Sequence, residues 1–222
     1  MTFISCNMVE RIFPRIGYGV SRLVFILVYS DRLVSAQERI TDQVTVTVNK
    51  GRVLGIHRGE GIARLPLAAG ENIIAIKAKG LTGFVQTSAR LLGYSGTFQR
   101  WSERRLDVSE HIHDIYVTPR LVLVVGEQQV YGFHENAGQW KVESLRPREI
   151  LKHIIVQDHV AVIITSRQAF GFSAFTGGFF SKDLPLTDTE IKSEANDNIV
   201  ILHLSDRHLV FRSGLAVWTE LR

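Results

Sequence analysis

One interval organises this sequence: equivalent residues recur every 39 positions over most of the chain. The interval appears in four columns that keep one common register: Trp101, Trp140, Phe179 and Trp218; Tyr94, Phe133, Phe172 and Phe211; Phe84, Leu123, Val162 and Ile201; Val85, Val124, Ile163 and Leu202. A shared register of this kind indicates tandem copies of one structural unit, and that unit limits what the chain can fold into.

Each unit contains four short apolar runs that are separated by turn residues. In the copy spanning 148–184 the runs lie at 150–156, 160–164, 169–172 and 179–184. These runs have the length of β-strands and are too short for helices. Glycine recurs near the third turn of every copy: Gly59 and Gly61, Gly96, Gly138, Gly177 and Gly178, and Gly214. Glycine at such a turn suits a tight hairpin, because it adopts positive φ without steric cost.

A second glycine column lies inside the third strand of the unit, at Gly55, Gly93, Gly132 and Gly171. Glycine within a strand indicates either a bulge or a close approach of another part of the chain. The second strands read as continuous apolar runs, such as 121–125, which is typical of sheets covered on both faces. We therefore expect the aromatic columns to fill the space between neighbouring sheets.

Four antiparallel strands repeated at about 40 residues are typical of β-propeller blades. The sequence predicts an all-β fold over residues 37–222, a β-propeller of about five four-stranded blades. A six-bladed ring is the alternative, in which another chain or residues 1–36 would supply the sixth blade.

The chain resembles the WD-repeat and quinoprotein propeller families over roughly residues 38–222. The resemblance lies in the apolar strand 121–125, in Val130-Tyr131-Gly132-Phe133 and in the turn Gly138-Gln139-Trp140. The WD pattern is incomplete, since no Trp-Asp pair ends a strand and no Gly-His pair opens a blade. The resemblance therefore implies a propeller fold and transfers no functional residue to this chain.

Residues 1–36 have the order of a secretory signal peptide. Arginines precede an apolar run at 23–29, and the small residues Ser35 and Ala36 follow it before Gln37. The run is too short to cross a bilayer as a helix, which takes about 20 residues. We expect cleavage after Ala36 and a secreted or periplasmic protein. If 23–29 is instead a strand, the leader is retained and the protein is cytoplasmic.

Charge and cysteine content limit the possible partners. The net charge is +4; residues 1–36 hold four arginines and two acids, so +2 of it lies there and +2 remains. Such a small positive charge gives little basis for nucleic-acid binding. The single cysteine, Cys6, lies outside the repeats, which excludes disulfides and cysteine-ligated zinc in the repeat region. We expect no cofactor and no bound structural metal, since the histidine pair His111 and His113 lacks a third ligand by spacing.

The candidate binding residues are four acids that precede the first strand of successive copies: Glu71, Glu110, Glu149 and Asp188. In a propeller the first strand is innermost, so these carboxylates would form a partial ring at one mouth of the central channel. Grouped carboxylates attract a cation or a basic protein partner. The alternative is that each acid caps a turn or solvates a loop.

No motif for nucleophilic or metal-dependent catalysis occurs in the sequence. The short loops favour a non-catalytic binding or assembly module whose partner is a protein. The alternative is a small propeller enzyme, such as a glycosidase or lyase, with a site in the central channel.

Overall fold

The computed structural model describes residues 42–59, 61–185 and 191–222, which lie within a compact unit that spans Arg39–Arg222. These described residues form 19 strands and no helix, which confirms the all-β prediction. The strands make five antiparallel sheets, and each sheet uses strands that are consecutive in sequence. The predicted leader 1–36, and the strand that would replace it at 23–29, lie outside the described residues.

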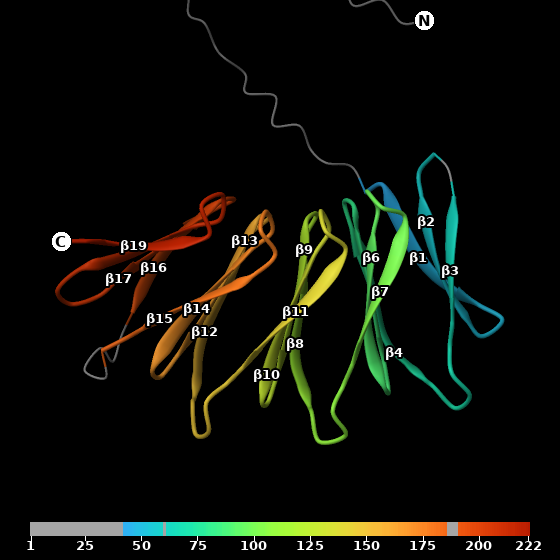
Figure 1. The fold of residues 1–222 in the computed structure, drawn as a ribbon, viewed down its shortest axis with the longest axis horizontal. Helices are drawn as coiled ribbons and strands as arrows, with labels where there is room; N and C mark the ends of the chain where they lie inside the picture. The colour runs from blue at the N-terminus through green and yellow to red at the C-terminus, as the bar shows by residue number, and fades with distance from the viewer. Residues whose placement is uncertain (1–41, 60, 186–190) are drawn as a thin grey trace, which may run out of the picture. The chain divides into compact units, whose positions relative to one another are not determined.

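Each sheet corresponds to one copy of the repeat, so the predicted β-propeller architecture of about five blades is confirmed (Figure 1). The first sheet contains β1 (Val44–Asn49), β2 (Arg52–His57) and β3 (Ile62–Pro66). The second contains β4 (Ile73–Lys79), β5 (Thr82–Thr87), β6 (Arg90–Ser95) and β7 (Arg100–Arg105). The third contains β8 (Ile112–Val117), β9 (Leu121–Gly126), β10 (Gln129–His134) and β11 (Gln139–Ser144).

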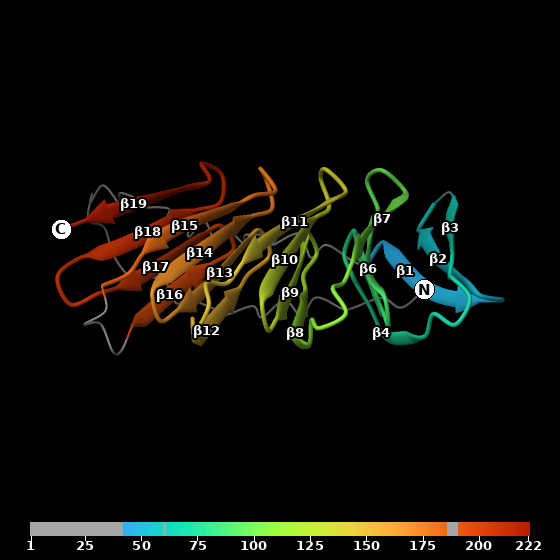
Figure 2. The ribbon, with the colours of Figure 1, turned by 60° about the horizontal axis from the view of Figure 1, so that its bottom comes forward.

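The fourth and fifth sheets repeat this order. The fourth contains β12 (Leu151–Val156), β13 (Val160–Thr165), β14 (Gln168–Ser173) and β15 (Phe179–Asp183). The fifth contains β16 (Lys192–Asn196), β17 (Ile199–His203), β18 (His208–Arg212) and β19 (Val217–Leu221). Both views show the sheets following one another in chain order (Figures 1 and 2).

In the first sheet the described residues form three strands of the predicted four. Its strands β1, β2 and β3 match the second, third and fourth strands of the other sheets in the repeat register. The position of its first strand, one repeat before β4, falls among residues that the structure does not describe. The prediction of four strands is therefore confirmed for the second to fifth sheets, and for the first sheet it remains a prediction.

The second and third strands of the middle sheets form the core. Strands β5, β9 and β13 are buried at every position, and β6, β10 and β14 at nearly every position. This pattern confirms that continuous apolar runs occupy sheets covered on both faces. Burial instead alternates along β2 and β17, so one face of these two strands is more exposed than the other, whereas residues 209–211 of β18 are buried on both faces.

An aromatic ring of each sheet packs against a glycine of the sheet before it. The contact recurs at every junction: Gly55 with Tyr94, Gly93 with Phe133, Gly132 with Phe172, and Gly171 with Phe211. A Cβ atom added to Gly132 would lie 2.3 Å from the ring of Phe172, closer than real Cβ contacts allow. The glycine column therefore marks a close approach between sheets, one of the two predicted meanings, and the aromatic columns fill the junctions as predicted.

A tryptophan of the fourth strand adds a hydrogen bond across the same junctions. The indole Nε1 of Trp140 donates to Ser102 O at 3.1 Å, and that of Trp218 donates to Phe180 O at 2.7 Å. Trp101 makes the equivalent bond to Ala63 O. Phe179 occupies the same column without a donor, so the junction between the third and fourth sheets lacks this bond.

At the third turn, the prediction that a recurring glycine adopts positive φ is wrong in two of the copies. The position with positive φ is a column of Gln99, Gly138, Gly177 and Ala216, with φ of 51°, 58°, 65° and 53°. Gly96 and Gly214 are not among the residues with positive φ, although glycine was predicted to serve the turn there. Gly96 is needed for space instead, since an added Cβ would lie 2.8 Å from the Val44 side chain.

Candidate functional site

Three of the four predicted acids occupy equivalent places, at the end of the connection that leads into a first strand. Each closes a tight turn through its own backbone: Glu71 N donates to Ala68 O, Glu110 N to Asp107 O, and Glu149 N to Arg146 O. The fourth acid, Asp188, lies outside the described residues. The repeat thus places Glu71, Glu110 and Glu149 at the same edge of successive sheets.

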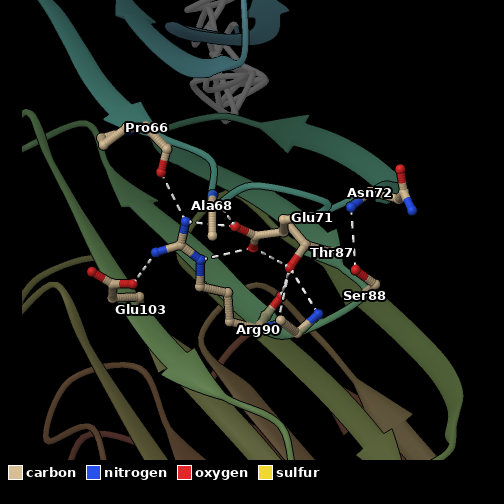
Figure 3. Close-up of polar contacts among 9 residues, drawn as sticks. Pro66, Ala68, Glu71, Asn72, Thr87, Ser88, Arg90 and Glu103 are labelled. Atoms are coloured by element: carbon tan, nitrogen blue, oxygen red, sulfur yellow. Dashed lines mark hydrogen bonds and ion pairs between the residues drawn. The ribbon is translucent and has the colours of Figure 1, made fainter.

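The carboxylate of Glu71 is almost fully buried, with 2% of its side chain exposed, and four hydrogen bonds hold it (Figure 3). Arg90 donates twice, from Nε at 2.8 Å and Nη2 at 2.9 Å. Thr87 Oγ1 donates at 2.6 Å and Ala68 N at 2.8 Å. Mainly because of the hydrogen bonds from Arg90, the pKa of Glu71 falls from 4.5 to about 2.

Arg90 in turn links the second sheet to the connection from the first. Its Nη2 also donates to Pro66 O, and its Nη1 contacts Glu103 (Figure 3). The pKa of Arg90 rises, first because of its hydrogen bond with Glu71. Glu71 and Arg90 are therefore an ion pair that fastens the turn before β4 to the hairpin between β5 and β6.

Glu149 repeats this bracing with a neutral partner. Its carboxylate accepts from Arg146 N at 2.8 Å, from Gln168 Nε2 at 3.2 Å and from Thr165 Oγ1. Gln168 occupies the repeat position of Arg90, two copies later in the chain. The contacts of Glu71 and Glu149 match the alternative in which each acid caps a turn.

Glu110 differs from the other two because it has fewer donors. The hydroxyl that Thr87 and Thr165 supply is missing, since Gly126 occupies that position. Oε1 of Glu110 accepts from Gln128 N at 3.1 Å and from Gln129 N at 3.3 Å. Its Oε2 is buried and has no hydrogen-bond partner. An unpaired buried carboxylate oxygen is unfavourable, and a ligand with a donor group would satisfy it.

Glu71 and Glu110 line one pocket of about 530 Å³. We call it the acidic pocket; four acids and two arginines are among its lining residues, which are Ala68, Glu71, Ser88, Ala89, Arg90, Glu103, Arg105, Leu106, Asp107, Val108 and Glu110. Its formal charge is therefore −2. Glu149 lines a separate pocket of about 390 Å³ together with Glu127, Arg146 and Arg148.

Sequence reasoning missed the partners of the acids. A signal for them exists at the repeat interval: Thr87 and Thr165 share one column, and Arg90, Gln129 and Gln168 share another. The threonine column identifies the hairpin that each acid contacts. The column of Arg90, Gln129 and Gln168 supplies further hydrogen-bond donors to the acids, from a side chain or from the backbone.

The described residues contain no cluster of three or more His, Cys, Asp and Glu side chains arranged to hold a metal ion. Nor does that part of the chain contain a helix long and apolar enough to cross a bilayer. The acidic pocket therefore offers charge and hydrogen-bond acceptors rather than a preformed metal site.

Comparison with known proteins gives no family for this chain. No family model matches it, and no curated protein matches it. Solved structures resemble it loosely. The crystal structure of HIRA(644–1017) is 12% identical, with 81% of this chain and 53% of that chain covered, at a TM-score of 0.34.

Two other solved structures give similar values. Yeast RCC1 (Prp20) bound to Kap60 is 10% identical over 78% of this chain and 54% of that chain, with a TM-score of 0.39. Hsv2p of Kluyveromyces lactis is 11% identical over 82% of this chain and 61% of that chain, with a TM-score of 0.36. The chain spans about half to three fifths of the length of these structures. At such identities and TM-scores, the likeness assigns no function.

Proposed function

We propose that this chain is a non-catalytic binding module, and that a protein partner inserts a basic side chain into the acidic pocket. The observation that carries this proposal is the buried Oε2 of Glu110, which lacks a partner in a pocket of net negative charge. A Lys or Arg side chain would supply both the missing donor and a compensating charge. Such a contact agrees with the expected attraction of the acids for a basic partner.

The state of the carboxylates supports binding over glycoside hydrolysis. A glycosidase needs one carboxylic acid that remains protonated near neutral pH beside a second, ionised carboxylate. The pKa of Glu71 is shifted the opposite way, to about 2, and its oxygens are occupied by Arg90, Thr87 and Ala68. Glu71 is thus suited to fastening the turn rather than to donating a proton.

We also propose that the module acts in the periplasm or outside the cell. The support is the sequence of residues 1–36, in which a basic segment, an apolar run and small residues follow one another. A protein in that location would meet its partner after export.

The test compares proteins captured from extract of the native host by the wild type and by two matched variants. The pocket variant is Glu110→Gln with Asp107→Asn. The control variant is Glu127→Gln with Asp183→Asn, which removes the same charge elsewhere. We expect a partner whose recovery falls at least about tenfold with the pocket variant and is unchanged with the control. Equal recovery of every captured protein by both variants would refute the pocket as the binding site.

A divalent cation is the other ligand that grouped carboxylates attract, and it is distinguished by calorimetry. Titration of calcium and magnesium into the wild type should give no saturable heat if the ligand is a basic side chain. Saturable binding that Glu110→Gln abolishes would instead assign the pocket to a cation.

A further inference from the structure

The hairpin of β17 and β18 brings two histidines of the fifth sheet together (Figure 2). His203 and His208 are directly paired across the two strands, and their Nδ1 atoms lie 3.0 Å apart. Their ring centroids are 4.8 Å apart, and the ring planes are inclined at 77°. Two imidazole nitrogens therefore face each other next to the turn.

The geometry of the hairpin explains this approach. Leu204 N donates to Arg207 O and closes the turn. Because hydrogen-bonded and non-hydrogen-bonded pairs alternate along an antiparallel ladder, the next pair, His203 with His208, is a non-hydrogen-bonded one. Side chains come closest at pairs of this kind. The backbone thus holds both imidazoles side by side before any ligand binds.

Packing of the repeat does not require histidine at these positions. The paired residues at the same repeat positions of the third and fourth sheets are apolar and buried: Val125 with Val130, and Ile164 with Ala169. In the fifth sheet the side chain of His203 is 31% exposed, and His208 is exposed. Imidazole is the commonest metal ligand in proteins, and here two imidazoles lie where a dissolved ion can reach them.

A carboxylate on the neighbouring strand orients one of the imidazoles. Oε1 of Glu194 on β16 lies 3.3 Å from Nε2 of His203, without meeting the geometry of a hydrogen bond. This contact favours the proton of His203 on Nε2 and leaves the lone pair on Nδ1, which faces His208. Metal-binding histidines commonly contact a carboxylate through one nitrogen and the metal through the other.

The separation of the two nitrogens indicates which metal fits. With metal–nitrogen bonds of about 2.0 Å, a separation of 3.0 Å corresponds to an angle of roughly 95° at the ion. That angle suits neighbouring positions of a tetragonal site better than those of a tetrahedral one. Tetragonal sites with nitrogen ligands favour Cu²⁺ or Ni²⁺, and Cu²⁺ binds the more tightly. Ca²⁺ and Mg²⁺ prefer oxygen ligands and do not fit this pair.

We propose that His203 and His208 bind a Cu²⁺ ion through their Nδ1 atoms, with Glu194 as a positioning residue. In the metal-free protein one Nδ1–H donates to the other Nδ1. The ion replaces that proton, which moves to Nε2 of the same ring. Within the ranges that the structure describes, no third His, Cys, Asp or Glu completes a metal site, so water fills the remaining positions. The site is independent of the acidic pocket and of the function proposed for it.

The first test titrates Cu²⁺ into the full-length protein in a Cys6→Ser background, because a free thiol also binds copper. We expect one saturable site by calorimetry and a tetragonal electron paramagnetic resonance signal that shows coupling to two nitrogens. His203→Asn and His208→Asn should each weaken this binding at least about tenfold. The control His153→Asn removes another exposed histidine and should leave it unchanged. Absence of a saturable site, or binding that neither substitution weakens, would overturn the proposal.

The second test separates metal binding from folding. An ion that binds the folded state stabilises it, so Cu²⁺ should raise the urea midpoint of the Cys6→Ser protein but not that of His208→Asn. Without metal, the midpoints of the two proteins should agree, because this pair is exposed. Glu194→Gln should weaken copper binding about tenfold while it keeps the two-nitrogen signal and the metal-free midpoint. A copper-induced rise that persists in His208→Asn would overturn the site, and unchanged affinity in Glu194→Gln would overturn the positioning role.

Discussion

At the scale of single residues, the acids in front of the first strands act through the donors that the neighbouring hairpin supplies. Glu71 has a guanidinium and a hydroxyl, Glu149 an amide and a hydroxyl, and Glu110 backbone amides alone. Buried carboxylates with full sets of donors stabilise a fold, while a buried acceptor without a donor, such as Oε2 of Glu110, is unfavourable. One repeated position therefore has different hydrogen-bond partners in different copies, and the neighbouring residues determine which partners it has.

The bracing role of Glu71 makes a prediction about acid stability. Its folded-state pKa of about 2 lies below its ordinary value of 4.5. The ionised group therefore stabilises the fold above about pH 4.5, and this contribution is lost as pH falls toward 2. We expect Glu71→Gln to lower the free energy of unfolding at pH 7 by about 3 kcal/mol and to flatten its decrease below pH 4.5.

Urea unfolding between pH 2 and 7 measures this effect. The control is Glu103→Gln, which contacts the same arginine but is 51% exposed. Its effect should stay below about 1 kcal/mol, because solvent screens an exposed pair. Equal effects of both substitutions would show that burial of Glu71 does not matter.

The third turn makes a second prediction at this scale. Ala216 has a φ of 53° in a column where Gly138 and Gly177 take similar values. Side chains with a Cβ are strained there, by more than the backbone entropy that glycine loses on folding. We expect Ala216→Gly to raise the free energy of unfolding by about 0.5 kcal/mol and Gly138→Ala to lower it by about 1 kcal/mol. Thermal unfolding of the two variants checks the opposite signs.

At the scale of strands and sheets, the junctions depend on a three-part contact between neighbours. A glycine in the third strand of one sheet receives the aromatic ring of the next, and the paired aromatic on the fourth strand lies against that ring. Phe133 and Trp140 form such a pair, with ring centroids 5.3 Å apart. The indole hydrogen bond then adds direction to a contact that is otherwise apolar.

Replacing the indole tests that hydrogen bond separately from the packing. We expect Trp140→Phe to lower the free energy of unfolding by about 2 kcal/mol, because a partly buried hydrogen bond and some apolar area are lost. Trp218→Phe should behave alike, since its bond to Phe180 O is equivalent. Unchanged stability in both variants would show that the indole hydrogen bond does not stabilise the junction. Chemical denaturation followed by far-ultraviolet circular dichroism provides the measurement.

At the scale of the whole molecule, the repeat interval was enough to predict the blade architecture and the four strands of the second to fifth sheets. Periodic apolar runs and aromatic columns indicate which residues are buried, and the pattern of burial recurs in every copy. The partner side chains of the acids were harder to predict, since a carboxylate gives no indication of which donor will reach it. Gly96 shows the same difficulty, because a glycine kept for space looks in sequence like a glycine kept for positive φ.

The proposed export predicts the residue at which the mature chain begins. We expect the protein recovered from the native host outside the cytoplasm to begin at Gln37, because small residues precede a signal-peptidase cut. Ala36→Arg should block this cleavage and leave the leader attached. Intact-mass analysis of both proteins decides the matter, and a wild-type mass that retains residues 1–36 would contradict export by this route.

The central claim is that successive blades interlock through glycine and an aromatic ring, and a double-mutant cycle on Gly132 and Phe172 tests it most directly. Gly132→Ala places a Cβ where the ring lies, and Phe172→Leu removes that ring. The double variant should be at least about 1 kcal/mol more stable than the sum of the single effects implies. Gly59→Ala, where nothing lies within 4 Å, should show no such coupling with Phe172→Leu. Effects that add within about 0.5 kcal/mol for Gly132 and Phe172 would contradict the interlocked junction.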